Sequence, residues 1–117
     1  MKVYLADPRK ENEMDSVVIH DYDTWNMDSS LAKIILPMLE EYASNLNGFP
    51  SCFNNIGEWV EVLDTMIYSF SQAVDCYPAI YAKDRFTKEK QTEIKERIKK
   101  IQVGFDNFGK YYMSLWD

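Results

Sequence analysis

The only histidine of the chain, His20, lies next to two carboxylates, Asp21 and Asp23. Histidine changes its charge near neutral pH, and with a carboxylate beside it can serve as a general base or a metal ligand. In an extended segment, however, alternate residues point to opposite faces, so His20 and Tyr22 share one face while the two aspartates share the other. The pattern therefore favours a surface histidine, and a small enzyme centred on His20 is the less favoured reading.

The sequence carries no other reaction motif. It has no GxSxG nucleophile elbow, no glycine-rich phosphate loop, no HExxH pair and no CxxC pair. The two cysteines, Cys52 and Cys76, are too few for a disulfide scaffold or a zinc site, and no histidine lies near them in the sequence. We therefore expect free thiols in a reducing compartment, no catalytic residue, no metal and no cofactor.

One flank of the last expected helix combines a cation, a small residue and a ring. Arg97, Gly104 and Tyr111 recur every seven residues and so share this flank. Arginine binds phosphate through two parallel hydrogen bonds, and aromatic rings stack on bases, so the flank is compatible with a nucleotide site. A helix–helix interface with close approach at the glycine is the favoured alternative. The candidate ligand or partner site also includes Phe108, Tyr112 and Trp116.

Trp25 and Asp28 bracket the expected start of the first helix. The carboxylate of Asp28 is a good N-cap, because it can accept hydrogen bonds from the free amides of the first turn. Trp25 would then pack the entering chain onto the core. A helix N-terminus beside an indole also suits a small anionic aromatic ligand, so both residues belong to the candidate ligand or partner site, although the structural role is favoured.

Three amphipathic segments predict three helices, at residues 29–46, 56–75 and 88–115. Pro37 falls inside the first helix, where we expect a kink. Asn55 is the expected N-cap of the second helix, with Glu58 reaching back as in a capping box. Thr87 is the expected N-cap of the third helix.

The third helix carries a regular apolar seam that becomes aromatic toward its end. The seam residues alternate at spacings of four and three: Ile94, Ile98, Ile101, Phe105, Phe108, Tyr112 and Leu115. Because this helix is longer than the second, an antiparallel pair is expected to leave its last turns without a helical neighbour. Either the N-terminal segment, through Tyr22 and Trp25, or a second copy must cover them. We predict a homo-oligomer, most simply a dimer.

The N-terminal residues predict a small β element. Residues 2–5 and 16–22 are short, β-branched and aromatic, and a polar stretch at 7–15 separates them. The fold class is therefore mainly α, a three-helix domain with an antiparallel helix hairpin and a small N-terminal β element. We expect a single domain over residues 1–117, with a β ribbon or extended arm at 1–22 and a helical core at 28–117.

The charge of the chain limits its partners. The formal net charge is −6, which disfavours direct nucleic-acid binding, because phosphates require a basic surface. The charge is uneven, with 14 acids and 6 bases in residues 1–86 but 5 acids and 7 bases in residues 87–117. No apolar run reaches the length needed to span a membrane, and the N-terminus does not resemble a signal peptide, so we expect no membrane association.

Several strings in the sequence resemble a family of small proteins encoded by tailed bacteriophages. They are DTWNMD at residues 23–28, FGKYY at 108–112 and LWD at 115–117, with Trp59 between them. The family has no assigned activity, so the resemblance transfers no catalytic residues. It implies a phage origin and a location in the cytoplasm of the infected bacterial host.

Three classes of function remain. The first is a non-catalytic phage accessory protein that binds a small ligand or a host defence protein, with sequestration of a nucleotide signal as one specific version. The second is a protein–protein interaction module, including an acidic mimic of nucleic acid. The third is the small enzyme centred on His20. The first two classes both bind a partner without catalysing a reaction. The absence of a reaction motif favours them over the enzyme.

Overall fold

The computed structural model describes residues 1–4, 16–78, 80 and 87–117. Its elements are β1 (Lys2–Tyr4), β2 (Ser16–Val18), the 3-10 helix η1 (Asp21–Thr24), α1 (Met27–Ser44), α2 (Ile56–Val74), α3 (Lys88–Tyr111) and the 3-10 helix η2 (Tyr112–Ser114). The prediction of a mainly α chain, with three helices and a small N-terminal β element, is confirmed.

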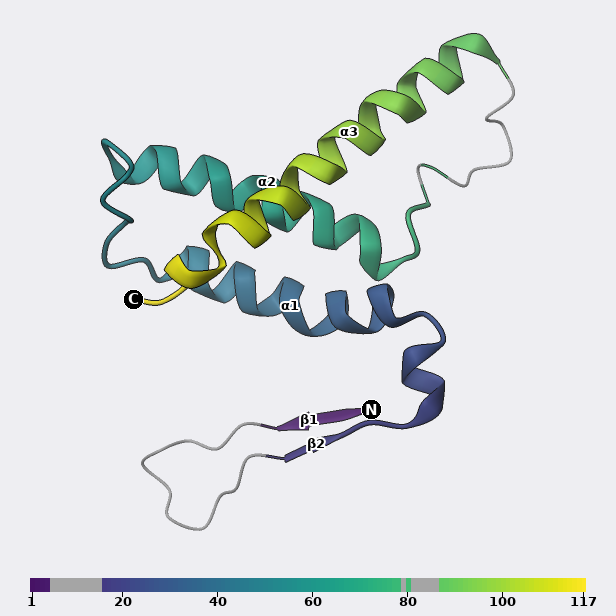
Figure 1. The fold of residues 1–117 in the computed structure, drawn as a ribbon, viewed down its shortest axis with the longest axis horizontal. Coiled ribbons are helices and arrows are strands. Elements are labelled where there is room, and N and C mark those ends of the chain that lie inside the picture. The colour runs from purple at the N-terminus through teal and green to yellow at the C-terminus, as the bar shows by residue number, and fades with distance from the viewer. Residues whose placement is uncertain (5–15, 79, 81–86) are drawn as a thin grey trace.

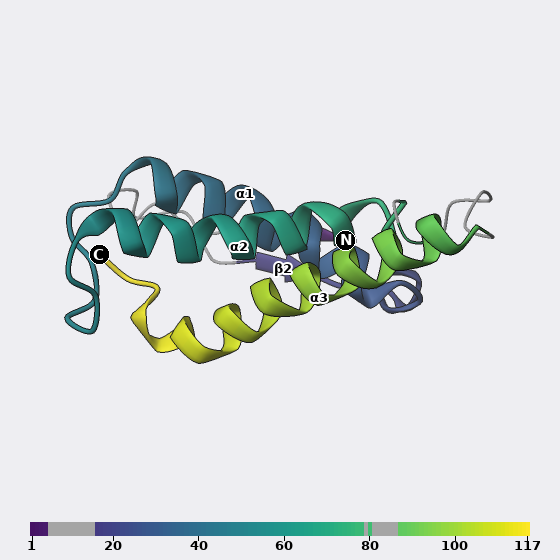
Figure 2. The same cartoon turned by 90° about the horizontal axis from the view of Figure 1, so that it is seen from above.

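The three helices form a flat arrangement with α2 in the middle. α1 lies beside α2, while α3 returns in the opposite sense and crosses α2 obliquely (Figure 1). Seen from above, α3 lies on one side of the layer made by α1 and α2 (Figure 2). Much of each helix therefore faces solvent.

The core is built around one face of α2. Its buried apolar residues recur at spacings of four and three, namely Trp59, Leu63, Met66, Phe70 and Ala73. Ala32 and Leu39 of α1 pack against this row. Burying each larger side chain contributes about 1.5–3 kcal/mol, so this row is the main source of stability. α2 is therefore the central helix, in contact with both α1 and α3.

The crossing of α2 and α3 depends on Gly104. A Cβ at this position would overlap with the Ser69 hydroxyl and the Thr65 carbonyl of α2. Ser69 is fully buried, and its hydroxyl donates a 2.6 Å hydrogen bond to the Ile101 carbonyl. One turn later, the Asn107 amide donates to the Thr65 hydroxyl at 2.8 Å. The sequence-based expectation of close backbone approach at Gly104 is correct.

Two of the three expected helix caps are confirmed. The Asn55 side chain accepts a hydrogen bond from the Glu58 amide at 3.0 Å, and the Thr87 hydroxyl accepts one from the Lys90 amide at 3.1 Å. Glu58 reaches back one residue further than expected, to the Asn54 amide. Both caps lie where a polar residue directly precedes an amphipathic run, which is a purely local signal.

Asp28 is not the N-cap of the first helix. α1 begins at Met27, because the backbone continues from η1 and Ser30 donates to the Asn26 carbonyl. Asp28 thus lies in the first turn, where its carboxylate accepts a 2.9 Å hydrogen bond from the Ser29 amide. Its charge remains favourable there, near the positive end of the helix dipole.

The third helix lacks a helical neighbour at its beginning. The prediction that its aromatic end would lack one is wrong. Tyr111 near the end of α3 packs on Trp59 near the start of α2, with ring centroids 5.8 Å apart. This register places the first turns of α3 past the end of α2, and Figure 1 shows them projecting from the body. The prediction failed because helix lengths alone do not determine which ends are aligned.

The N-terminal strands form an antiparallel pair in which Lys2 lies opposite Val18. The second strand is shorter than predicted, because Asp21, Tyr22 and Asp23 form a 3-10 helix instead. Leu5 and the predicted polar connection at 7–15 lie outside the described residues. Among the helices of the described ranges, none is long and apolar enough to cross a membrane.

Candidate functional site

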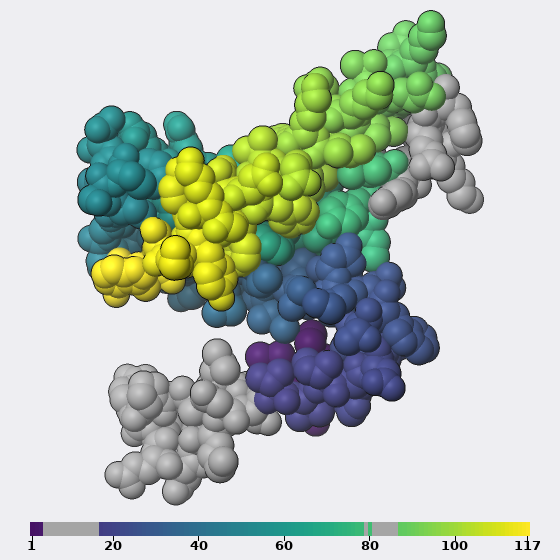
Figure 3. Space-filling view, in the orientation of Figure 1, coloured from purple at the N-terminus to yellow at the C-terminus, as the bar shows by residue number. Residues whose placement is uncertain are grey.

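An apolar depression lies between α1 and α3. It consists of two adjoining cavities of about 430 and 300 Å³, which share Ile35 and Phe108. α1 and α3 both pack on α2, and α2 forms part of the floor through Phe70 and Ala73. We call this depression the α1–α3 groove. In the space-filling view, α3 lies diagonally over α2, and α1 emerges below it (Figure 3).

Both walls of the groove are apolar. The α1 wall consists of Leu31, Ile35, Met38 and Tyr42, at spacings of four, three and four. On an α-helix, side chains with this spacing form a ridge against which another helix packs. The opposite wall consists of Phe105 and Phe108 of α3, Tyr112 of η2 and Leu115 just after η2.

A hydrogen bond joins the neighbouring elements at each end of the groove. At one end, the buried Ser29 hydroxyl donates to the Val74 carbonyl at 2.7 Å and so joins the start of α1 to the end of α2. At the other end, the Tyr42 hydroxyl donates to the Trp116 carbonyl at 3.2 Å. These two hydrogen bonds therefore help to fix the walls of the groove relative to the rest of the chain.

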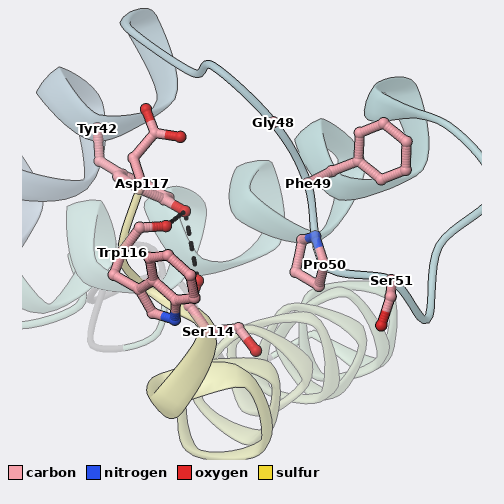
Figure 4. A pocket seen from close by; sticks show the side chains of 8 residues that line it. All are labelled: Tyr42, Gly48, Phe49, Pro50, Ser51, Ser114, Trp116 and Asp117. Atoms are coloured by element: carbon pink, nitrogen blue, oxygen red, sulfur yellow. Dashed lines mark hydrogen bonds between the residues drawn. The ribbon is translucent and has the colours of Figure 1, made fainter.

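A third cavity, of about 350 Å³, adjoins the groove at Tyr42. Figure 4 shows the Trp116 indole and the Pro50 ring on opposite sides of this space, with the Ser114 hydroxyl between them. Asp117 lies at its edge, where its carboxylate accepts hydrogen bonds from the backbone and side-chain nitrogens of Asn47 at 3.0 and 2.8 Å. The segment after α3 is thereby fixed against the loop after α1.

Large apolar side chains remain exposed around the groove. Met38 is 57% exposed, and beyond the end of α3 the exposed fractions are 89% for Met113 and 76% for Trp116. Aromatic residues and methionine are enriched at protein interfaces, and tryptophan and tyrosine often dominate their binding energy. Their exposure around an apolar depression marks this surface as a candidate binding site.

The predicted flank of Arg97, Gly104 and Tyr111 does not surround a cavity. Gly104 is closed off by α2, as described above, and Tyr111 packs between Phe53 and Trp59 with ring centroids 5.3 and 5.8 Å away. Arg97 lies about 21 Å from Tyr111 along the helix axis, and its guanidinium pairs with Glu93 at 3.3 Å. The flank is thus mainly a helix-packing surface.

The other predicted site residues divide between the groove and its surroundings. Phe108 and Tyr112 line the groove, and Trp116 lies at its end. Asp28 borders the groove at the start of α1. Trp25 is not part of it, because its ring packs on Tyr22 at 5.3 Å and is 74% exposed. Phe53, rather than Tyr22 or Trp25, covers Tyr111.

Asp23 has a structural role next to His20. Its carboxylate is nearly buried and accepts a 2.9 Å hydrogen bond from the His20 backbone amide. The Met1 ammonium lies 3.1 Å from the same oxygen. These contacts lower the pKa of Asp23, the His20 backbone hydrogen bond being the largest cause and the Met1 ammonium a further one. Asp23 is therefore held as an anion by the fold around it.

The described residues contain no cluster of three or more histidine, cysteine, aspartate or glutamate side chains suited to a metal ion. Cys52 and Cys76 are both exposed free thiols, as expected. No family model, curated protein or solved structure matches the chain.

Sequence reasoning missed the groove although its residues were recognised as apolar. The α1 residues that form one wall belong to the stripe that predicted the first helix, and such a stripe normally indicates core. The number of apolar residues in the first helix could have indicated the groove. α1 has more apolar positions than α2 alone can cover, so some of them must be left open or be covered by another element. That α3 leaves some of them open depends on the crossing at Gly104.

Proposed function

We propose that this protein acts by binding and not by catalysis, as a helical interaction module whose α1–α3 groove accepts an α-helix of a partner protein. The observation that carries this proposal is the continuity of the groove, whose two cavities share Ile35 and Phe108, with helix-packing spacing along the α1 wall. Helix-in-groove recognition uses apolar anchors at the same spacing on the bound helix.

The dimensions of the groove fit a short helix. The α1 wall from Asp28 to Tyr42 extends over about 21 Å, or four helical turns. A bound helix of about 14 residues would place three or four apolar side chains along this length. Exposed Met38 and Tyr112 would contact such a helix directly, and neither needs to leave a packed position in order to do so.

The chemistry of the groove favours a protein partner over a nucleotide. The cations at the start of α3 lie far from the aromatic residues of the groove, and only Asp28 contributes a charged side chain to its two cavities. A nucleotide needs a positive group near its phosphates, whereas an apolar helix does not. Together with the sequence resemblance, this supports a role as a phage accessory protein whose target is a host protein.

A titration with a designed helix tests the proposal. The probe is a fluorescein-labelled amphipathic peptide of leucine and lysine with an i, i+3, i+4, i+7 apolar stripe, followed by fluorescence anisotropy. Met38→Glu places a charge in the groove at an exposed position, and we expect it to weaken binding at least tenfold. Val103→Glu is the matched control, because Val103 is exposed on α3 but lines none of the three cavities described above. Equal binding by the two variants would refute the groove as the site.

A further inference from the structure

The first half of α3 is a basic amphipathic helix whose first turns project past α2 (Figure 1), while Lys100 at its end contacts the Tyr68 ring of α2 at 4.0 Å. Residues 88–100 contain six bases and three acids. Ile94 and Ile98 lie on its apolar seam, and Ile98 is 46% exposed. We call residues 88–100 the α3 overhang. It has the two properties that a ligand of the groove requires, namely a helical conformation and an apolar ridge flanked by solvated charges.

The α1–α3 groove and the third cavity beside it have the opposite charge. Their only charged lining residues are two acids at opposite ends, Asp28 and Asp117. The helices that form the groove floor and one wall are also acidic, with net charges of −2 for α1 and −3 for α2, whereas the overhang has a net charge of +3. Opposite potentials on two surfaces steer them together and determine their orientation.

We propose that two copies of this chain form a two-fold symmetric dimer in which the α3 overhang of each copy occupies the α1–α3 groove of the other. The inference rests on the proposed function, because it names the helix that fills the groove in the free protein. Ile98 of each copy contacts Met38 and its neighbours in the other copy, and the basic flank lies near Asp28. The contact occurs twice by symmetry. A partner helix then competes with the second copy for the groove.

Light scattering and sedimentation of designed variants test the dimer. We expect wild type to have twice the chain mass, and both Met38→Glu and Ile98→Glu to have the mass of a monomer. Val103→Glu should remain dimeric. All three positions are exposed, so we expect each variant to fold. Circular dichroism checks that it does. A monomeric wild type, or a dimer that persists in both groove and overhang variants, overturns the inference.

Mixing the two monomeric variants gives a second, independent test. A pair made of one Met38→Glu chain and one Ile98→Glu chain retains one intact contact, between the wild-type overhang of the first and the wild-type groove of the second. Equimolar mixing should therefore restore dimers that neither variant forms alone. Absence of any mass increase on mixing contradicts the exchange of α3 overhangs.

The same variants distinguish this inference from the proposed function. The groove of the Ile98→Glu variant is intact and unoccupied by a second copy, so this variant should bind the designed peptide at least as tightly as wild type. If wild type is monomeric and still binds the peptide in a Met38-dependent manner, the dimer is wrong and the helix-binding function stands. If neither wild type nor Ile98→Glu binds the peptide, the helix-binding function is wrong whatever the mass.

Discussion

The hydroxyl of Ser69 donates a 2.6 Å hydrogen bond to the carbonyl of Ile101, between two helices whose backbones nearly touch. A buried hydroxyl at a helix crossing needs an acceptor, and here the acceptor is a backbone carbonyl of the neighbouring helix. This bond and the absence of a side chain at Gly104 determine where α3 crosses α2. The position of the crossing in turn determines the α1–α3 groove.

Replacing Gly104 by alanine should destabilise the protein. The new methyl group would overlap with the Ser69 hydroxyl and the Thr65 carbonyl, and the backbone atom cannot move without shifting α2. Overpacking of this kind costs about 1–3 kcal/mol, and we expect a net loss near the upper end despite the better helix propensity of alanine. Urea unfolding measures the change in the free energy of unfolding.

Gly109→Ala is the matched control for this prediction. Gly109 is also inside α3, but nothing lies within 4 Å of a Cβ placed there. Alanine should therefore stabilise the protein by about 1 kcal/mol through helix propensity alone. If the two alanine variants had equal effects, the close contact at Gly104 would be refuted.

The contact between Asp23 and the His20 amide should depend on pH in the acid range. The pKa of Asp23 is lowered from its ordinary value of 3.8, so its carboxylate stabilises the folded segment above that pH. The stabilisation is lost as the pH falls through the lowered pKa, when the carboxyl becomes protonated. Amide hydrogen exchange at His20 should accelerate relative to other amides in this window. In Asp23→Asn this additional acceleration should be absent.

Cys76→Gly should stabilise the protein. Cys76 has a φ of 56°, in the left-handed region that non-glycine residues adopt only at a cost. Glycine adopts this conformation without the cost, so we expect a gain of about 0.5–1 kcal/mol in thermal or urea unfolding. The exposed Cys52, which does not have a positive φ, gives the control substitution. A Cys52→Gly variant that gained as much would show that loss of the thiol, and not the backbone, is responsible.

Tyr42→Phe should loosen the segment that follows α3. The Tyr42 hydroxyl donates to the carbonyls of Ser114 and Trp116 at 3.4 and 3.2 Å, and phenylalanine removes both bonds while preserving the ring that lines the groove. We expect a loss of about 1 kcal/mol and lower heteronuclear NOE values at residues 115–117. Tyr112→Phe is the control, because the exposed Tyr112 ring packs on Phe108 at 5.5 Å. Unchanged NOE values in Tyr42→Phe would contradict the anchoring role.

Local signals in the sequence were sufficient to predict the three helices and two of their caps. The third helix, however, ends at Tyr111 and not at the predicted residue 115, because residues 112–114 form the 3-10 helix η2. Asn55 and Thr87 act within three residues of themselves, so their roles follow from their position before an apolar run. Asp28 was misassigned because the chain enters α1 directly from η1, and the sequence gives little indication of a 3-10 helix at residues 21–24. The error moved the start of the helix by two residues.

The candidate site could be predicted only in part, because it depends on contacts between distant residues. Phe108, Tyr112 and Trp116 were identified from their chemistry alone, and they line the groove or its end. Met38 and Ile35 belong to the apolar stripe of the first helix, and such a stripe does not reveal whether a neighbouring helix covers it. The alignment of Tyr111 with Trp59 also could not be derived from helix lengths.

The close contact at Gly104 gives α3 a pivot. Because α3 touches α2 most closely at a residue without a side chain and then diverges, a small tilt about this point moves both ends of α3 in opposite directions. A tilt that increases the distance between Phe108 and Ile35 must also move the basic first turns of α3. Gly104 is buried at the crossing and lines neither cavity of the groove. A single substitution there would therefore change the width of the groove without altering any residue that lines it.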